Sequence, residues 1–186
     1  MGKIKMFKKK NKFNYHNLAV PSKSKKYLDL GCKTERVEGA IGVDVDPNVK
    51  PDVLHDLSKY PYPFEPNSID GVFARHIIEH LDDPEGFIKE CHRILKPHSF
   101  LYIETPHFSN YVAYSQPQHK FFYSYFIFRE LFDKADYVVD LQEITFHRRF
   151  RRLGIRSLAN KFPLEYERFW TYLFPAENIR VVLEKK

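Results

Sequence analysis

Five short apolar segments, each followed by a polar or acidic residue, constrain the fold of this 186-residue chain more than any other feature. Apolar strands of this kind, joined by connecting segments, are typical of a parallel sheet that is covered on both faces. We therefore predict an α/β fold with a largely parallel sheet. The predicted strands are Tyr27–Leu30, Ala40–Val43, Asp52–His55, Ile69–Ala74 and Phe100–Glu104.

The segment after the fourth strand has the signals of a helix. Asp83 is a suitable N-cap, and Pro84 suits the first helical position. Apolar residues then recur at helical spacing from Phe87 until Pro97 ends the pattern. We predict a helix between these limits.

Two further strands and one short connection complete the predicted sheet. The strands are Tyr137–Ile144, which alternates in polarity, and Ile179–Leu183 near the end of the chain. The first connection, from Gly31 to Ala40, has only ten residues, which is too short for a full crossover helix.

The charge is unevenly distributed along the chain. Residues 1–26 contain nine lysines and no acidic residue, so the remainder carries −3 although the total is +6. We predict that residues 1–25 form a basic, flexible tail and that residues 26–186 form one domain. Such a tail suits contact with RNA or another polyanion. Within the domain, a helical insertion is expected over residues 148–175.

Composition excludes several classes of protein and sets the expected compartment. Hydrophobic residues make up 43% of the chain, enough for a packed core. Two cysteines are too few for a disulfide scaffold and fit a reducing compartment. No apolar run reaches the roughly 20 residues of a membrane-spanning helix, and the N-terminus lacks the apolar stretch of a signal peptide. A cytoplasmic protein is therefore expected.

The residues that follow the predicted strands suit a nucleoside-like ligand. In an open α/β sheet, ligands bind beyond the carboxyl ends of the strands. Gly31, after the first strand, lets a ligand approach the backbone closely. Asp44, after the second strand, is able to accept hydrogen bonds from both hydroxyls of a ribose diol, and Asp56, after the third, from an adenine amino group.

Two longer segments carry a resemblance to a known family. The run YLDLGCKTERVEGAIGVDVD, residues 27–46, resembles the first motif and the acidic second strand of class I S-adenosylmethionine (SAM) dependent methyltransferases. Residues 68–97 resemble a later segment of the branch that acts on small molecules. Residues 105–110 and 162–179 are similar to a subgroup of bacterial and archaeal methyltransferase-domain proteins.

This resemblance implies a fold and a function. The fold is a Rossmann-like, mostly parallel seven-stranded sheet with helices on both faces, a short first crossover and an antiparallel last strand. The function is transfer of a methyl group from SAM to an acceptor, for which a small molecule is the expected class. The acceptor itself is not identified by the resemblance.

The resemblance also assigns a cofactor site. The residues that match it are Gly31, Cys32, Lys33, Asp44, Val45, Asp56, Leu57, Arg75 and His76. Asp44 matches the acid that binds the ribose, and Arg75 with His76 matches the segment beside the sulfonium. The loop after the first strand departs from the usual glycine-rich pattern, because Lys33 and Glu35 stand where glycines are expected. Lys33 is suited to pair with the carboxylate of SAM.

The acceptor side is expected after the fifth strand. Residues 106–126 combine many aromatic side chains with a few polar ones, a mixture typical of a mostly apolar pocket. We predict that this segment forms a wall and lid of the site. A hydroxyl or ammonium acceptor must lose a proton to a base. His107 and His119 are the predicted catalytic residues for that step.

Three alternatives compete with this interpretation. Residues 76–80 match H-x-x-E-H, a zinc-peptidase signature, but the helix there is short and no third ligand is evident, so no metal site is predicted. A dinucleotide site needs G-x-G-x-x-G, which residues 31–36 lack. The third alternative is a non-catalytic binding module with a methyltransferase fold, associated with RNA through the basic tail. Affinity for SAM discriminates between this module and the enzyme.

Overall fold

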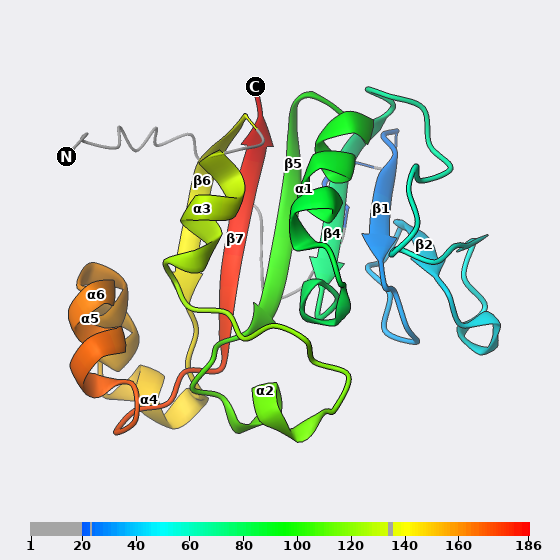
Figure 1. Cartoon of the computed structure of the whole chain (residues 1–186). Helices are drawn as coiled ribbons and strands as arrows, with labels where there is room; N and C mark the ends of the chain where they lie inside the picture. Colours follow the sequence, from blue (N-terminus) through cyan, green and yellow to red (C-terminus); the bar gives the residue numbers. More distant parts are fainter. Residues whose placement is uncertain (1–19, 23, 134–135) are drawn as a thin grey trace.

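The computed structural model describes residues 20–22, 24–133 and 136–186, and Figure 1 shows their arrangement. The predicted basic tail therefore lies almost entirely outside the described residues. Within the described part of the chain, no helix is long and apolar enough to cross a membrane.

A seven-stranded sheet lies at the centre of the molecule. Its strands are β1 (Tyr27–Leu30), β2 (Ile41–Asp44), β3 (Val53–Leu54), β4 (Ile69–Arg75), β5 (Leu95–Pro106), β6 (Tyr137–Ile144) and β7 (Asn178–Lys185). The strand order is β3-β2-β1-β4-β5-β7-β6. Strands β1 to β5 are parallel, and β7 lies antiparallel between β5 and β6. The predicted mostly parallel sheet with an antiparallel last strand is confirmed.

The connections in the first part of the sheet contain little regular structure. Residues 31–40 join the adjacent parallel strands β1 and β2 through turns, as the short first crossover predicted. Between β2 and β3 lies one 3-10 turn, η1 (Pro47–Val49), where the Asp46 carboxylate accepts a hydrogen bond from the Asn48 amide at 2.9 Å. This part of the molecule therefore depends on side-chain hydrogen bonds rather than on helices.

Most helices follow later in the chain. They are η2 (Ile78–His80), α1 (Pro84–Ile94), α2 (Tyr111–Ser115), α3 (Ile127–Asp133), α4 (Arg148–Arg152), α5 (Ile155–Lys161), α6 (Pro163–Glu165) and the π-helical turn η3 (Tyr166–Trp170). Helices α1 and α3 lie over the same face of the sheet (Figure 1). The four short helices from α4 to η3 fall within the segment predicted as an insertion.

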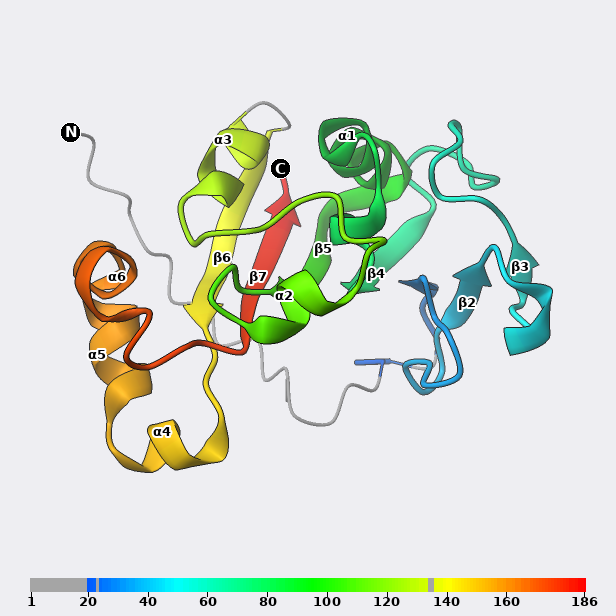
Figure 2. The same cartoon turned by 60° about the horizontal axis from the view of Figure 1, so that its bottom comes forward.

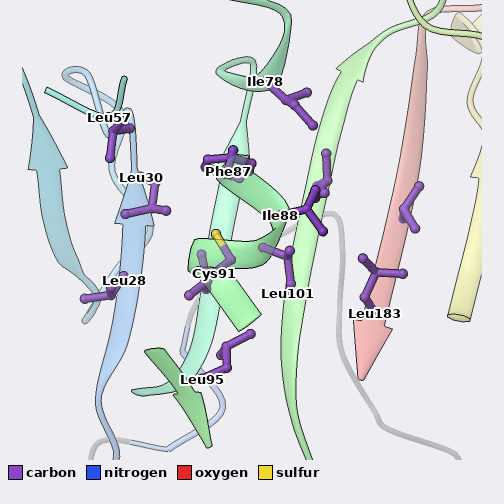
Figure 3. Packing of buried hydrophobic residues seen from close by; sticks show 14 of the residues in the cluster. Leu28, Leu30, Leu57, Ile78, Phe87, Ile88, Cys91, Leu95, Leu101 and Leu183 are labelled. Carbon is purple, nitrogen blue, oxygen red and sulfur yellow. The ribbon is translucent and has the colours of Figure 1, made fainter. Parts of the chain in front are cut away.

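Helix α1 is fixed by its N-cap and by its apolar face. The Asp83 carboxylate accepts a hydrogen bond from the Gly86 amide at 2.8 Å, which satisfies one free N–H of the first turn. Figure 3 shows Phe87, Ile88 and Cys91 among buried side chains of the central strands. Burial raises the pKa of the Cys91 thiol well above its ordinary value, so this cysteine is a protonated core residue.

The face of the sheet opposite α1 carries a row of acidic and arginine side chains of alternating charge. Arg75 is in register with Glu104, and Glu104 with Arg180. Salt bridges join Arg75 to Asp29 at 3.0 Å and Arg180 to Glu104 at 2.6 Å. We call this row the charge ladder; its members in strand order are Asp29, Arg75, Glu104, Arg180, Glu143 and, from α5, Arg156. Helices thus contact both faces of the sheet, as predicted.

The ladder keeps Glu104 ionised inside the protein. Burial acts to raise the pKa of Glu104, but the hydrogen bond and the positive charge of Arg180 outweigh it, so the pKa lies below its ordinary value of 4.5. A carboxyl group whose pKa is lowered on folding stabilises the protein above its unfolded pKa. That contribution is lost as the pH falls through the lower, folded-state pKa.

We predict that Arg180→Met lowers the free energy of unfolding by about 3 kcal/mol at pH 7, because Glu104 is then buried without its main counter-charge. The deficit relative to the wild type should narrow toward pH 4, because burial alone raises the pKa of Glu104 and protonation removes its charge. Urea unfolding at both pH values measures the effect. The exposed control Lys89→Met should change stability by less than about 0.5 kcal/mol. An equal deficit at both pH values would contradict the pairing.

Candidate cofactor and acceptor site

A cavity of about 350 Å³ lies beyond the carboxyl ends of β1, β2 and β3. Six of the nine predicted cofactor residues line it: Gly31, Lys33, Asp44, Val45, Asp56 and Leu57. Its size suits a small ligand. The strand-end pattern in the sequence therefore located most of this cavity.

The loop after β1 makes a tight turn at the bottom of the cavity. Gly31 has φ +68°, and an added Cβ would lie 3.0 Å from the side chain of Ile77. Lys33 also has a left-handed backbone, with φ +46°. This conformation favours glycine, so the lysine occupies a position where the backbone geometry is that of a glycine.

Asp44 is held in place by the backbone around it. One carboxylate oxygen accepts from the Lys33 amide and the other from the Asp46 amide, each at 3.0 Å. Each oxygen of a carboxylate offers about two lone-pair sites. Asp44 is therefore held in a fixed orientation where it lines the cavity. Each of its oxygens retains one acceptor site, which is the arrangement that a diol requires.

Asp56 and Leu57 form the wall after β3. The Ser58 amide donates to Asp56 at 3.0 Å, and this hydrogen bond, aided by Lys59, lowers the pKa of the carboxyl group. Leu57 is buried, and its carbonyl accepts a hydrogen bond from the hydroxyl of Tyr62 at 2.9 Å. This corner thus combines an ionised acceptor with an apolar contact.

Three predicted cofactor residues do not line the cavity. Cys32 is buried against Gly42, and burial raises the pKa of its thiol. Arg75 lies in the charge ladder, where it pairs with Asp29. His76 has a left-handed backbone with φ +51°, and its ring lies beside Glu79 and Glu104 at 3.5 and 3.9 Å.

The turn η2 contributes residues that the sequence did not predict for the cavity. Ile77, His80 and Leu81 line it on the side of β4. Burial lowers the pKa of His80 and outweighs the opposing effect of the neighbouring Glu79 carboxylate. The ring centroids of His80 and His119 are 4.7 Å apart, so one predicted catalytic residue lies next to the cavity wall.

The segment 106–126, which contains α2, runs past the carboxyl ends of the parallel strands (Figure 2). It is held to η2 by the main chain, because the amides of Lys120 and Phe121 donate to the Glu79 carbonyl at 2.8 and 3.4 Å. The Tyr123 hydroxyl adds a hydrogen bond to the Ile78 carbonyl at 3.2 Å. These contacts bring His119 to η2.

His107 is placed differently from His119. Its side chain is fully buried and does not line the cavity. Its Nδ1 accepts from the Ser109 amide at 3.1 Å, so Nε2 carries the hydrogen and donates to Glu167 at 3.1 Å. These contacts tie the end of β5 to η3 and favour a structural role over a catalytic one.

A second, larger cavity of about 600 Å³ lies among α5, α6 and η3. It is lined almost entirely by apolar side chains, including Leu158, Phe162 and Trp170. None of the predicted site residues lines it. The smaller cavity at the strand ends is therefore the candidate site, because several charged and polar side chains line it, whereas Glu165 is the one charged residue that lines the larger cavity.

Comparisons with known proteins identify similar sequences and folds. Residues 28–103 match the family model described as a methyltransferase domain. A SAM-dependent methyltransferase from Archaeoglobus fulgidus is 21% identical, with a TM-score of 0.65 and coverage of 87% of this chain and 86% of that chain. A SAM-dependent methyltransferase from Mesorhizobium loti is 12% identical, with a TM-score of 0.61 and coverage of 87% and 91%.

A third structure carries the cofactor. The phosphoethanolamine N-methyltransferase 2 of Haemonchus contortus, in complex with S-adenosyl-L-methionine, is 19% identical with a TM-score of 0.60. The match covers 87% of this chain but 48% of that protein, so the chain corresponds to about half of its length. None of the curated proteins searched matches the sequence.

The fold is that of class I SAM-dependent methyltransferases, and this agrees with the strand order and the antiparallel β7. In this chain, residues 28–103 are the part identified as a methyltransferase domain. The resemblance noted in the sequence is confirmed.

The left-handed lysine of the loop makes a testable prediction. Lys33→Gly should raise the free energy of unfolding by about 0.5–1 kcal/mol, because relief of backbone strain exceeds the entropy that glycine adds to the unfolded chain. Urea unfolding measures the change. Lys59→Gly, at an exposed bend residue without a positive φ, is the control and should not stabilise the protein. A destabilised Lys33→Gly variant would show that the lysine side chain itself supports the loop.

A second prediction concerns His107. His107→Ala should lower the free energy of unfolding by roughly 2–4 kcal/mol, because it opens a cavity and removes one of the two hydrogen-bond donors of Glu167, the other being the Tyr125 amide. Thermal and urea unfolding measure this loss. A variant that is as stable as the wild type but has lost turnover would instead restore the catalytic assignment.

Proposed function

We propose that this chain is a SAM-dependent methyltransferase that uses the cavity at the strand ends as its cofactor site. The observation that carries the proposal is Asp44, a backbone-oriented carboxylate with free acceptor sites, in a cavity shared with Gly31 and Asp56. The shared fold of a relative crystallised with SAM supports the same interpretation.

The residues of the cavity suit different parts of SAM. Asp44 would accept the two ribose hydroxyls, and Asp56 the adenine amino group beside the apolar side chain of Leu57. The loop at Gly31 and Lys33 would receive the methionyl part, with the lysine ammonium near its carboxylate. SAM supplies an electrophilic methyl group, so the protein has mainly to bring the acceptor in line with it.

The acceptor is proposed to bind where the segment 106–126 meets η2. His80 lines the cavity there, and His119 is its neighbour. An acceptor hydroxyl or ammonium must lose a proton before or during transfer, and these two histidines are the proposed groups for that side of the reaction. A small-molecule acceptor is the proposed class.

Calorimetric titration with SAM tests the proposal. Asp44→Ala should weaken SAM binding by about 1.5–3 kcal/mol, the value of hydrogen bonds to a charged group. Asp136→Ala is the matched control, since this exposed aspartate pairs with Lys186 rather than lining the cavity. Unchanged affinity in a folded Asp44→Ala protein would remove Asp44 from the site. A wild-type protein that gives no heat with SAM would favour the non-catalytic binding module.

A further inference from the structure

Three side chains that bind metals in other proteins converge beside the candidate site. A carboxylate oxygen of Glu79 and one ring nitrogen each of His80 and His119 lie within 4.8 Å of one another. In the zinc motif of the sequence, His76 and His80 are the two ligands and Glu79 is the base, and no third ligand is evident. In the structure the group has a different composition: Glu79 and His80 are joined by His119 from the segment 106–126, and His76 does not belong to it.

The two histidines are oriented with their outer nitrogens available. Nδ1 of His80 faces the carbonyl of Gln118 at 3.3 Å, and Nδ1 of His119 faces the carbonyl of Ala113 at 2.9 Å. A carbonyl only accepts hydrogen bonds, so each Nδ1 carries the hydrogen and each Nε2 keeps its lone pair. A histidine held by a carbonyl in this way is the usual form of a metal ligand.

Glu79 provides an independent observation. Its side chain is 1% exposed, and one oxygen accepts from the Thr105 hydroxyl at 3.0 Å. The other oxygen, Oε1, is buried without a hydrogen-bond partner; its nearest basic group is Nδ1 of His76, 3.5 Å away. A buried carboxylate oxygen that lacks a donor is costly, and a bound cation would satisfy it.

The surroundings hold the three residues together without blocking them. Main-chain hydrogen bonds from Lys120 and Phe121 to the Glu79 carbonyl fix the segment of His119 to η2. The ammonium group of Lys120 is paired with Asp82 at 2.6 Å. The charge of Lys120 is therefore balanced by Asp82, so this lysine does not occupy the carboxylate of Glu79.

We propose that Glu79, His80 and His119 bind one zinc ion at the acceptor end of the cavity. Two imidazoles and one carboxylate are a ligand set that zinc favours, whereas magnesium and calcium prefer oxygen ligands. The ligand atoms lie up to 4.8 Å apart. Zinc bonds of 2.0–2.2 Å place tetrahedral ligands roughly 3.3 Å apart, so the most distant pair must approach by up to about 1.5 Å. His80 lines the cavity, so a fourth position would open toward it.

The open position identifies the acceptor as a hydroxyl compound, an inference that rests on the proposed function. A zinc-bound hydroxyl loses its proton near neutral pH, and the proton passes to solvent. The oxygen then forms a bond to the methyl carbon while the carbon–sulfur bond breaks and its electron pair stays on sulfur. The products are a methyl ether and S-adenosylhomocysteine. With zinc bound, His80 and His119 would serve the loss of the acceptor proton by holding the metal, and neither would take up the proton itself.

The test uses the full chain with zinc and cobalt(II) as probes. Equilibrium dialysis with metal analysis should find one zinc per wild-type chain. His80→Ala and His119→Ala should weaken zinc binding by more than the 10–100-fold that loss of an outer-sphere partner costs. His98→Ala, an exposed histidine at the opposite end of β5, is the control and should bind like the wild type. Cobalt(II) should give the strong visible absorption of four- or five-coordinate metal only where both ligand histidines are present.

The outcomes separate this proposal from the methyltransferase assignment. Zinc that binds equally to wild type and to His119→Ala, or a wild type that binds none, would overturn the metal site. Circular dichroism of each variant verifies that it is folded, and Glu79→Gln, which preserves the acceptor for Thr105, provides a second variant expected to lose the metal. A wild type that binds zinc but not SAM would overturn the proposed function and leave the zinc site standing.

Discussion

The position of β7 depends on the charge ladder across one face of the sheet. Strand β7 runs antiparallel to both of its neighbours. Because side chains alternate between the two faces of a sheet, a shift of β7 by two residues would keep its apolar side chains on the same face. The apolar pattern alone therefore does not fix the register of β7. Arg180 removes that ambiguity, since it bonds Glu104 at 2.6 Å on one side and lies 3.8 Å from Glu143 on the other. A shift of two residues would leave the buried Glu104 without its arginine, whereas Glu143 would keep Arg156 at 2.7 Å. The ends of β5, β6 and β7, and the segments that leave them, are thereby fixed relative to the cavity.

The cavity lies at the carboxyl-end edge of the sheet and is formed mainly by residues that follow the strands, with few contributed by helices. The loop after β1 has two left-handed residues, Gly31 and Lys33, and the amide of Lys33 donates a hydrogen bond to Asp44. The strained lysine and the oriented carboxylate are thus parts of one hydrogen-bonded unit. Because its amide donates to Asp44, Lys33 keeps the left-handed backbone that usually favours glycine.

The sequence predicted the sheet and most of the cavity because both depend on local signals. Short apolar strands ending in acids placed Asp44 and Asp56 correctly, since residues after parallel strands share one edge. Arg75, which the resemblance assigned to the cofactor site, does not line the cavity: it is the last residue of β4, and its side chain pairs with Asp29 in the charge ladder, a contact that its place in the sequence does not reveal. The proximity of His80 and His119 depends on main-chain bonds between η2 and a segment about 40 residues away. No periodicity or spacing in the sequence encodes such a contact, although the H-x-x-E-H motif marked one half of it.

The hydrogen bonds between η2 and the segment 106–126 set how often that segment can open. Two amides bond the Glu79 carbonyl, and the Tyr123 hydroxyl bonds the Ile78 carbonyl. At about 1 kcal/mol net for each bond, their loss costs roughly 3 kcal/mol. Such a difference corresponds to an open population of roughly 1%. At equilibrium the segment is therefore closed nearly all the time, and a small molecule that enters only when the segment is open would bind roughly 100-fold more weakly than to the open form.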